Sequence, residues 1–149
     1  MAIHKIDGVD GVVNYPKKFV TLYAQGALTK GDVVGIGTTV TNGAGLHVAH
    51  SDGGTALVTG SIRAVGIVTE TVADGAEVQV QVAGYNDMAT AGGIIVYAAE
   101  VMFDIATPGR VITTTARSIT VKPFGICVDA FTSGNADGAI MIFDHGIYG

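Results

Sequence analysis

The sequence has few charged residues, one cysteine and no tryptophan, and the first two shortages each exclude a class of protein. Charged residues occupy 14% of the 149 positions, against about 25% in ordinary domains. With 48% hydrophobic residues, this balance excludes the charge-rich, core-poor class of disordered chains and predicts one compact domain. Cys127 cannot form an internal disulfide alone, and its apolar neighbours predict that it is a small core residue.

Basic residues and membrane-spanning runs are also lacking. The eight Lys and Arg residues are scattered and the net charge is −5, so no basic stripe exists for a nucleic-acid backbone. The longest uncharged run, residues 33–51, is interrupted by Gly, Asn and His and is not expected to cross a membrane. Residues 1–11 carry charges where a secretory signal needs an apolar stretch. We therefore expect a soluble protein made in the cytoplasm.

The abundant residues are those of β-sheets. Val, Ile and Thr occur 20, 14 and 16 times, whereas Leu occurs four times, and 22 glycines supply turns. β-branched residues pack well on a pleated surface and fit a helical turn poorly, so this ratio predicts an all-β fold. The alternation of valine and polar residues in 77–83 predicts a half-buried strand. Further strands are predicted at residues 32–36, 117–121 and 139–143, loops at 84–90 and 132–137, and at most a short helix near 89–91 or 97–102.

The two halves of the sequence resemble each other. The motif AVGIV at 64–68 precedes DGA and a strand, and PFGICV at 123–128 precedes a second DGA and a strand. Gly66 and Gly125 lie 59 positions apart, and Asp74 and Asp137 lie 63 apart. A weaker match pairs residues 28–34 with 89–95 at a spacing of 61. Three matches in the same order predict a duplication, with two similar β units closing one small Gly-rich barrel or sandwich.

No constellation typical of catalysis is present. His47 and His50 lie in a predicted strand or loop, where positions i and i+3 face opposite ways, so a shared metal ion is not expected. His4 and His145 lie near the termini. The aspartates mostly neighbour Gly or Asn, which is typical of turns. We predict no catalytic residue, no cofactor and no metal ligand, and hence a protein that is not an enzyme.

The ends of the chain are more apolar than idle tails. Residues 1–14 contain Ile3, Ile6, Val9 and Val12, interrupted by Asp7, Gly8, Asp10 and Gly11. We predict that this segment is an extended arm preceding a single β domain at 15–149. The alternative is an ordinary first strand tied into the sheet. At the other end, Ile147 and Tyr148 are candidates to dock on the body or on a partner.

The order of these motifs resembles a known family. ALTKGDVV at 27–34, AVGIV at 64–68, DGAEVQVQV at 74–82, FGICV at 124–128 and DGAIMIF at 137–143 resemble the capsid decoration, or cement, proteins of tailed bacteriophages. The likeness covers residues 20 to 144 and rests on turn glycines and valine strands. The sequence departs from plainer members in a longer segment at 38–61.

The resemblance implies a β-tulip-like domain on the outer surface of a virion, synthesised in the host cytoplasm. Its expected partners are the major capsid protein, whose neighbouring subunits it would clamp, and itself, as a homotrimer. A terminal arm that adds to a neighbour's sheet would gain main-chain hydrogen bonds, so the predicted contact residues are Ile3, Ile6, Val9, Val12, Ile147 and Tyr148. Two alternatives remain open: a carbohydrate-binding or adhesive β module using tyrosines, and a metal-dependent enzyme using His47 and His50.

Overall fold

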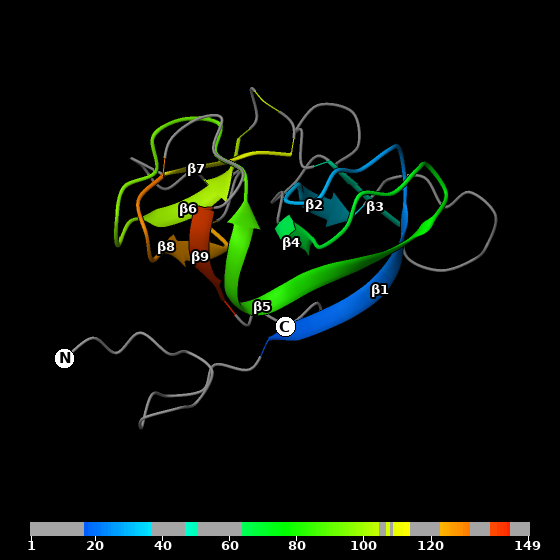
Figure 1. Ribbon diagram of the computed structural model, residues 1–149, viewed down its shortest axis with the longest axis horizontal. Coiled ribbons are helices and arrows are strands. Elements are labelled where there is room, and N and C mark those ends of the chain that lie inside the picture. The colour runs from blue at the N-terminus through cyan, green and yellow to red at the C-terminus, as the bar shows by residue number, and fades with distance from the viewer. Residues whose placement is uncertain are drawn as a thin grey trace.

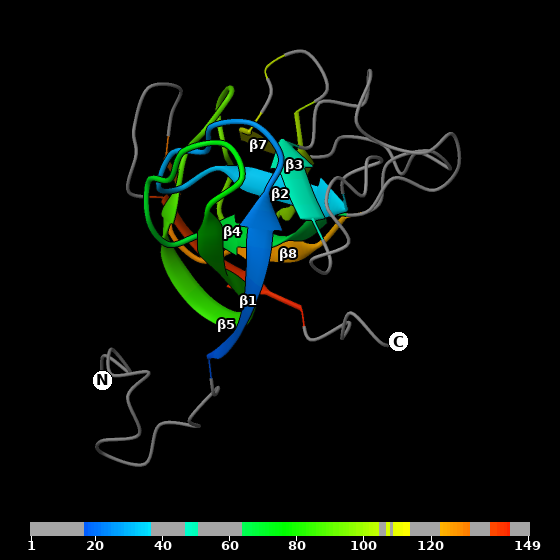
Figure 2. The same cartoon turned by 90° about the vertical axis from the view of Figure 1, so that its right-hand side faces the viewer.

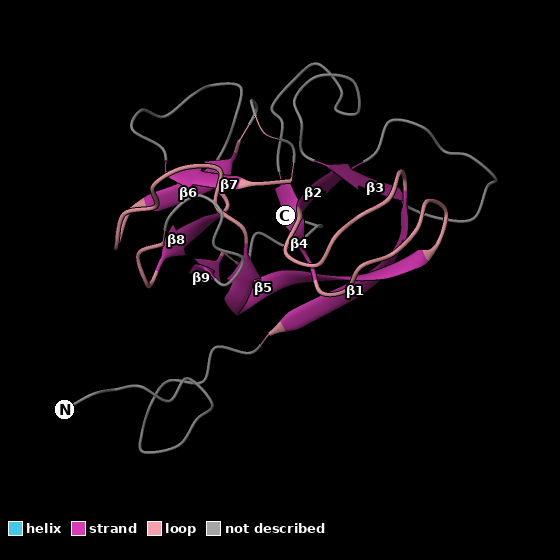
Figure 3. Cartoon of the chain, turned by 45° about the horizontal axis from the view of Figure 1, so that its top comes forward, coloured by secondary structure: helices cyan, strands magenta, loops and turns pink. Residues whose placement is uncertain are grey.

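The computed structural model describes residues 17–36, 47–50, 64–104, 107, 109–113, 123–131 and 138–143, and every regular element in these ranges is a strand (Figure 3). The all-β prediction is confirmed. Within the same ranges, no helix has the length and apolar character needed to cross a membrane. The strands are β1 Lys18–Ala24, β2 Val33–Ile36, β3 His47–His50, β4 Ala64–Val68, β5 Glu77–Ala89, β6 Glu100–Phe103, β7 Val111–Thr113, β8 Gly125–Cys127 and β9 Gly138–Ile142.

The strands form two five-membered rings that share β5. In the first ring the order is β1-β3-β2-β4-β5, and β5 closes the ring by pairing with β1. In the second, the later part of β5 continues through β9, β8, β6 and β7, and a parallel bridge from Ala91 to Val111 closes it. Figure 1 shows β5 running beneath both groups of strands, and Figure 2 shows β1 lying along its first half.

The rings have the same topology and the same register. In each ring the first strand pairs parallel with the third, whereas the other pairs are antiparallel. Gly35 faces Ala49 as Met102 faces Ile112. The predicted construction from two similar halves is therefore confirmed. Equivalent residues, taken from these registers, include Leu22 and Ala89, Ala24 and Ala91, Leu28 and Ile95, Val34 and Val101, Val68 and Cys127, and Val80 and Ile140.

The repeat was aligned correctly in one of three places. Gly66 and Gly125 are equivalent: a side chain at either would strike a backbone carbonyl of the next strand, that of Gln81 or Met141. The alignment of 28–34 with 89–95 is wrong, because the matching bridges Leu28–Val72 and Ile95–Phe131 make Leu28 equivalent to Ile95, six positions beyond Ala89. The two DGA motifs are not equivalent either, since Gly75 lies in a turn whereas Gly138 begins β9.

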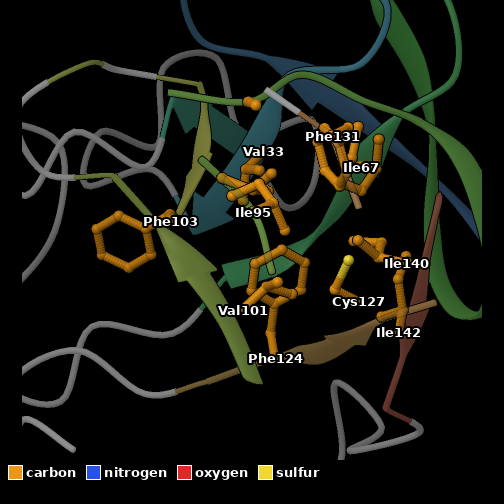
Figure 4. Packing of buried hydrophobic residues seen from close by; sticks show 13 residues of the cluster. Val33, Ile67, Ile95, Val101, Phe103, Phe124, Cys127, Phe131, Ile140 and Ile142 are labelled. Carbon is orange, nitrogen blue, oxygen red and sulfur yellow. The ribbon is translucent and has the colours of Figure 1, made fainter. Parts of the chain in front are cut away.

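The buried hydrophobic residues form two core clusters. The first, inside the first ring, contains Leu22, Ala24, Leu28, Val34, Val68, Val78 and Val80. The second, shown in Figure 4, contains the equivalents of all of these except Val78, larger side chains of the second ring, and also Val33 and Ile67 from β2 and β4 of the first ring. Where the first core has Val78, the second has Gly138, and the ring of Phe131 occupies the space that a side chain there would need. Phe131 replaces Val72 at the matching bridge, so the larger residue compensates for the smaller one and keeps the packing dense.

Buried amides mark the place where β5 passes between the rings. Gly84 has a φ of +91°, which favours glycine, and follows the pairs with β1 and β4. Gln81 and Asn86 are fully buried on either side of it. Nε2 of Gln81 donates to the carbonyls of Ala83 and Tyr85 at 3.1 and 2.8 Å, and Nδ2 of Asn86 donates to Oε1 of Gln81 at 3.0 Å. These bonds satisfy polar groups that would otherwise be costly to bury.

Two local predictions were wrong in the same region. Residues 84–90 were expected to be a loop, but β5 continues to Ala89 because β9 pairs with it beyond the Gly84 bend. The helix expected near 97–102 is instead the start of β6, since Glu100 and Val101 pair with β8. The helix near 89–91 is replaced by the end of β5 and the Ala91 bridge. The strand predicted at 117–121 and the loop at 132–137 lie outside the described residues.

Candidate functional site

The predicted contact residues do not fall in the described part of the chain. Ile3, Ile6, Val9 and Val12 belong to residues 1–16, and Ile147 and Tyr148 belong to residues 144–149, all outside the described ranges. Their role as contacts, and the division into an arm at 1–14 and a domain at 15–149, stay predictions. A candidate site can therefore be sought only on the two rings, which contain the described residues.

The chemistry-bearing side chains of the rings are dispersed. Across the described residues, no group of three or more His, Cys, Asp and Glu side chains is placed to hold a metal ion. His47 and His50 are the two ends of β3, in agreement with the predicted strand. Asp74 accepts a hydrogen bond from the Gly26 amide at 2.8 Å, and Asp32 accepts one from the Thr29 amide at 2.7 Å. These two aspartates therefore have turn roles, as their sequence context predicts.

Cys127 is a core residue, as predicted. Only 1% of it is exposed, and its thiol donates to the carbonyl oxygen of Asp129 at 3.1 Å. Burial raises the pKa of the Cys127 thiol, because the thiolate would lose its solvation. A thiol held in its neutral form is a poor nucleophile.

One hollow on the surface of the first ring is open and polar. It has a volume of about 590 Å³ and is lined by Thr21, Thr69, Glu70, Glu77, Val78 and Gln79. Its polar groups bond to one another: the Thr69 hydroxyl donates to the carbonyl of Gln79 at 3.1 Å, and the Gln79 amide donates to Glu70 at 3.4 Å. The Tyr23 hydroxyl donates to Glu77 at 3.2 Å. This arrangement stabilises the start of β5 at Glu77–Gln79.

The most unusual surface feature is an exposed apolar loop between β5 and β6. Four large hydrophobic side chains are exposed in the described residues, and three of them are Ile94, Val96 and Tyr97, at 74%, 54% and 68%. We call residues 94–97 the apolar loop. It leads into β6 at the left-hand edge of Figure 1. Clustering of this kind marks interaction sites more often than single exposed residues do.

The apolar loop is held firmly by the ring beneath it. Ile95, between the exposed residues, is buried in the second core and exchanges two backbone hydrogen bonds with Phe131, at 2.8 and 3.3 Å. The Val96 amide donates to the Thr113 hydroxyl at 3.0 Å, and that hydroxyl donates to the Ile94 carbonyl at 3.4 Å. The exposed side chains are therefore presented on a fixed backbone.

This loop was not predicted from the sequence. Residues 88–99 form an uncharged run between Asp87 and Glu100, and that run was interpreted in part as a short helix. The sequence feature that could have indicated the loop is the run of four large apolar residues at 94–97. A surface helix would not expose all four of these side chains together. Which of the four side chains points inward depends on the Phe131 bridge, and periodicity does not show that bridge.

The fold of this chain is similar to that of a solved protein structure. No protein-family model matches the sequence, and no curated protein matches it. Among solved structures, the chain is similar to the N base of head fiber gp8.5 in bacteriophage phi29, with a TM-score of 0.58 and 12% sequence identity. The match covers 87% of this chain and 100% of that one. At this identity the likeness establishes a shared fold.

Proposed function

We propose that this protein is a structural component of a phage virion that binds the outside of the head and clamps neighbouring capsid subunits. The observation that carries the proposal is the fold, which is shared over 87% of the chain with the base of a phage head fiber. The motif resemblance to capsid decoration proteins was recognised independently of that fold. The two sources agree on a head-associated protein.

The surface chemistry is consistent with a protein that binds and does not catalyse. In the described ranges, the carboxylates of Asp32, Glu70, Asp74 and Glu77 accept hydrogen bonds at turns or strand ends, and the cysteine is buried. A clamp instead requires a rigid body and contacts that repeat over a lattice, where modest single-site affinities multiply. Two rings of strands that share β5 supply such a body. We therefore propose a non-enzymatic role with the major capsid protein and a second and third copy of this chain as partners.

Co-sedimentation with phage heads that lack this protein tests the proposal. We expect the purified chain to pellet with the heads at a fixed number of copies per capsid subunit and to raise their resistance to heat. Analytical ultracentrifugation of the free protein then tests the proposed homotrimer. Failure to pellet with any head preparation, including expanded heads, would overturn the proposed function.

The proposed arm has its own test. Deleting residues 1–11 removes Ile3, Ile6 and Val9 but none of the described rings, so we expect head binding to be lost while the unfolding temperature is unchanged. As a matched control, His4→Ala with Lys5→Ala alters polar arm residues only and should bind normally. Full binding by the deleted chain would exclude the arm as the contact.

A carbohydrate-binding or adhesive module is the second candidate. The observation that favours it is Tyr97, an aromatic ring 68% exposed, since sugar faces stack on exposed aromatics. We expect no binding on a glycan array, because the neighbours of Tyr97 in the apolar loop offer aliphatic groups in place of the polar partners that sugar hydroxyls need. Specific glycan hits that Tyr97→Ala abolishes would favour this alternative over the capsid role.

A further inference from the structure

The duplication supplies an internal reference for the apolar loop. The loop before β2 is its equivalent, because Leu28 bridges Val72 as Ile95 bridges Phe131. Both loops end in the same way: the Gly31 amide donates to the Val68 carbonyl at 2.9 Å, and the Ala98 amide donates to the Cys127 carbonyl at 2.9 Å. The two loops therefore have the same backbone hydrogen bonds but different side chains.

The two versions differ in the residues that they expose. The first loop exposes Ala27, Thr29 and Lys30, and the second exposes Ile94, Val96 and Tyr97 at the equivalent positions. In both loops the residue between them, Leu28 or Ile95, is buried. Since the first loop folds in the same way with a small, a polar and a charged residue, the fold does not require the apolar side chains of the second. Exposing them costs solubility, so a binding role is the physical reason to keep them.

We infer that the apolar loop is an anchor that docks into an apolar depression on the protein subunits of the phage head. This inference rests on the proposed function and names the face of the chain that carries it. The loop is pinned by Thr113 and Phe131, so little conformational freedom is lost on binding. A fixed aliphatic and aromatic cluster of this kind is typical of the central anchor of an interface.

The chemistry of the loop selects this partner over others. No charged residue lies between Asp87 and Glu100, so the loop offers no cation to a nucleic-acid backbone or an anionic lipid headgroup. Loop-to-loop pairing with a second copy would bury only three large side chains from each chain, which is too few for the roughly 1,200 Å² of a stable interface. On a head, the loop is instead one contact among many that repeat with the lattice.

A loop transplant tests the inference. The variant Ile94→Ala/Val96→Thr/Tyr97→Lys gives the second loop the exposed residues of the first, which the same backbone already tolerates. Thr29→Ala/Lys30→Ala is the matched control in the other loop. Both variants should unfold at the wild-type temperature. We expect the transplant to weaken co-sedimentation with heads at least about tenfold, at low and at high salt alike, while the control binds as the wild type does. Tyr97→Ser is a milder second variant.

The other outcomes each overturn the inference in a recognisable way. Normal head binding by the transplant would refute the anchor and leave the proposed function standing. A change of oligomeric state in ultracentrifugation would show that a second copy covers the loop. Flotation of the wild type, but not the transplant, with neutral phosphatidylcholine vesicles would assign the loop to a membrane. If the wild type does not pellet with heads, the proposed function fails and the anchor fails with it.

Discussion

Ala98 stands where the duplicated fold places a glycine, and replacing it should stabilise the protein. Its φ is +62°, the one positive value among the non-glycine residues that the structure describes, and its equivalent Gly31 has +91°. In this region an L-residue with a Cβ pays about 1–2 kcal/mol. Glycine avoids that cost but loses about 0.5–1 kcal/mol more chain freedom on folding. We expect Ala98→Gly to raise the free energy of unfolding by about 0.5–1 kcal/mol.

The reverse substitution in the other loop should be far more costly. In Gly31→Ala the new methyl group meets the strain of a positive φ and also overlaps the carbonyl oxygen of Met88, with the Thr90 hydroxyl oxygen 2.9 Å away. Both neighbours belong to the shared-strand region and cannot withdraw without disturbing it. We expect a loss of about 3 kcal/mol or more. At these two equivalent positions, Ala98→Gly is therefore expected to raise the free energy of unfolding and Gly31→Ala to lower it.

Urea titration followed by circular dichroism measures both effects, and thermal scans give a second reading. For a chain of this length a gain of about 0.5–1 kcal/mol corresponds to about 1–4 °C. Equal m-values in the three proteins would show that the denatured state is unchanged. A destabilised Ala98→Gly protein, or a Gly31→Ala protein as stable as the wild type, would refute the structural equivalence of the two loops.

Two further predictions concern the buried polar groups. Gln81→Ala should lower the free energy of unfolding by about 2–4 kcal/mol, because the carbonyls of Ala83 and Tyr85 and the Asn86 amide lose their partner. Gln79 is exposed on the same strand, so the control Gln79→Ala should change that free energy by no more than about 0.5 kcal/mol. Similar losses for the two variants in urea titrations would contradict the network. The pKa of Cys127 is raised in the folded state above its ordinary value of 9.0. The folded chain therefore holds the thiol proton more tightly than the unfolded chain does, and the free energy of unfolding should decline as the pH rises above 9.0. In pH-dependent unfolding experiments Cys127→Ala should lack that part of the decline, and an unchanged profile would refute the assignment.

Residue type and local pattern predicted much of the fold. The excess of β-branched residues over leucine indicated an all-β chain, and the alternation in 77–83 located the first half of β5. Gly66 and Gly125 revealed the duplication because each strand passes too close to its neighbour's carbonyls for a side chain. These features depend on the residue itself and its immediate neighbours.

Features that depend on pairing with distant residues were not predicted. The end of β5 looked like a loop because Gly84 interrupts the alternation, although β9 pairs with the residues beyond it. The equivalence of Leu28 and Ile95 was missed because the connections in the two halves differ in length by several residues. The apolar loop is visible only when Ile95 is known to turn inward against Phe131. The predicted contacts at Ile3 and Tyr148 fall outside the described residues.

Because the two rings share β5, their stability is coupled. Residues 77–83 of β5 pair with β1 and β4, and residues 84–89 pair with β9, so each ring uses its own half of the strand. Cutting the chain at Gly84 would leave the strand pairs of each ring in place, but separating the rings would expose Val33 and Ile67, which are buried against the second core. The two rings should therefore exchange their slowest amide hydrogens together, as one cooperative unit. Evolution of such a chain can alter the exposed residues of one ring freely, as the two loops illustrate, but it cannot discard either ring.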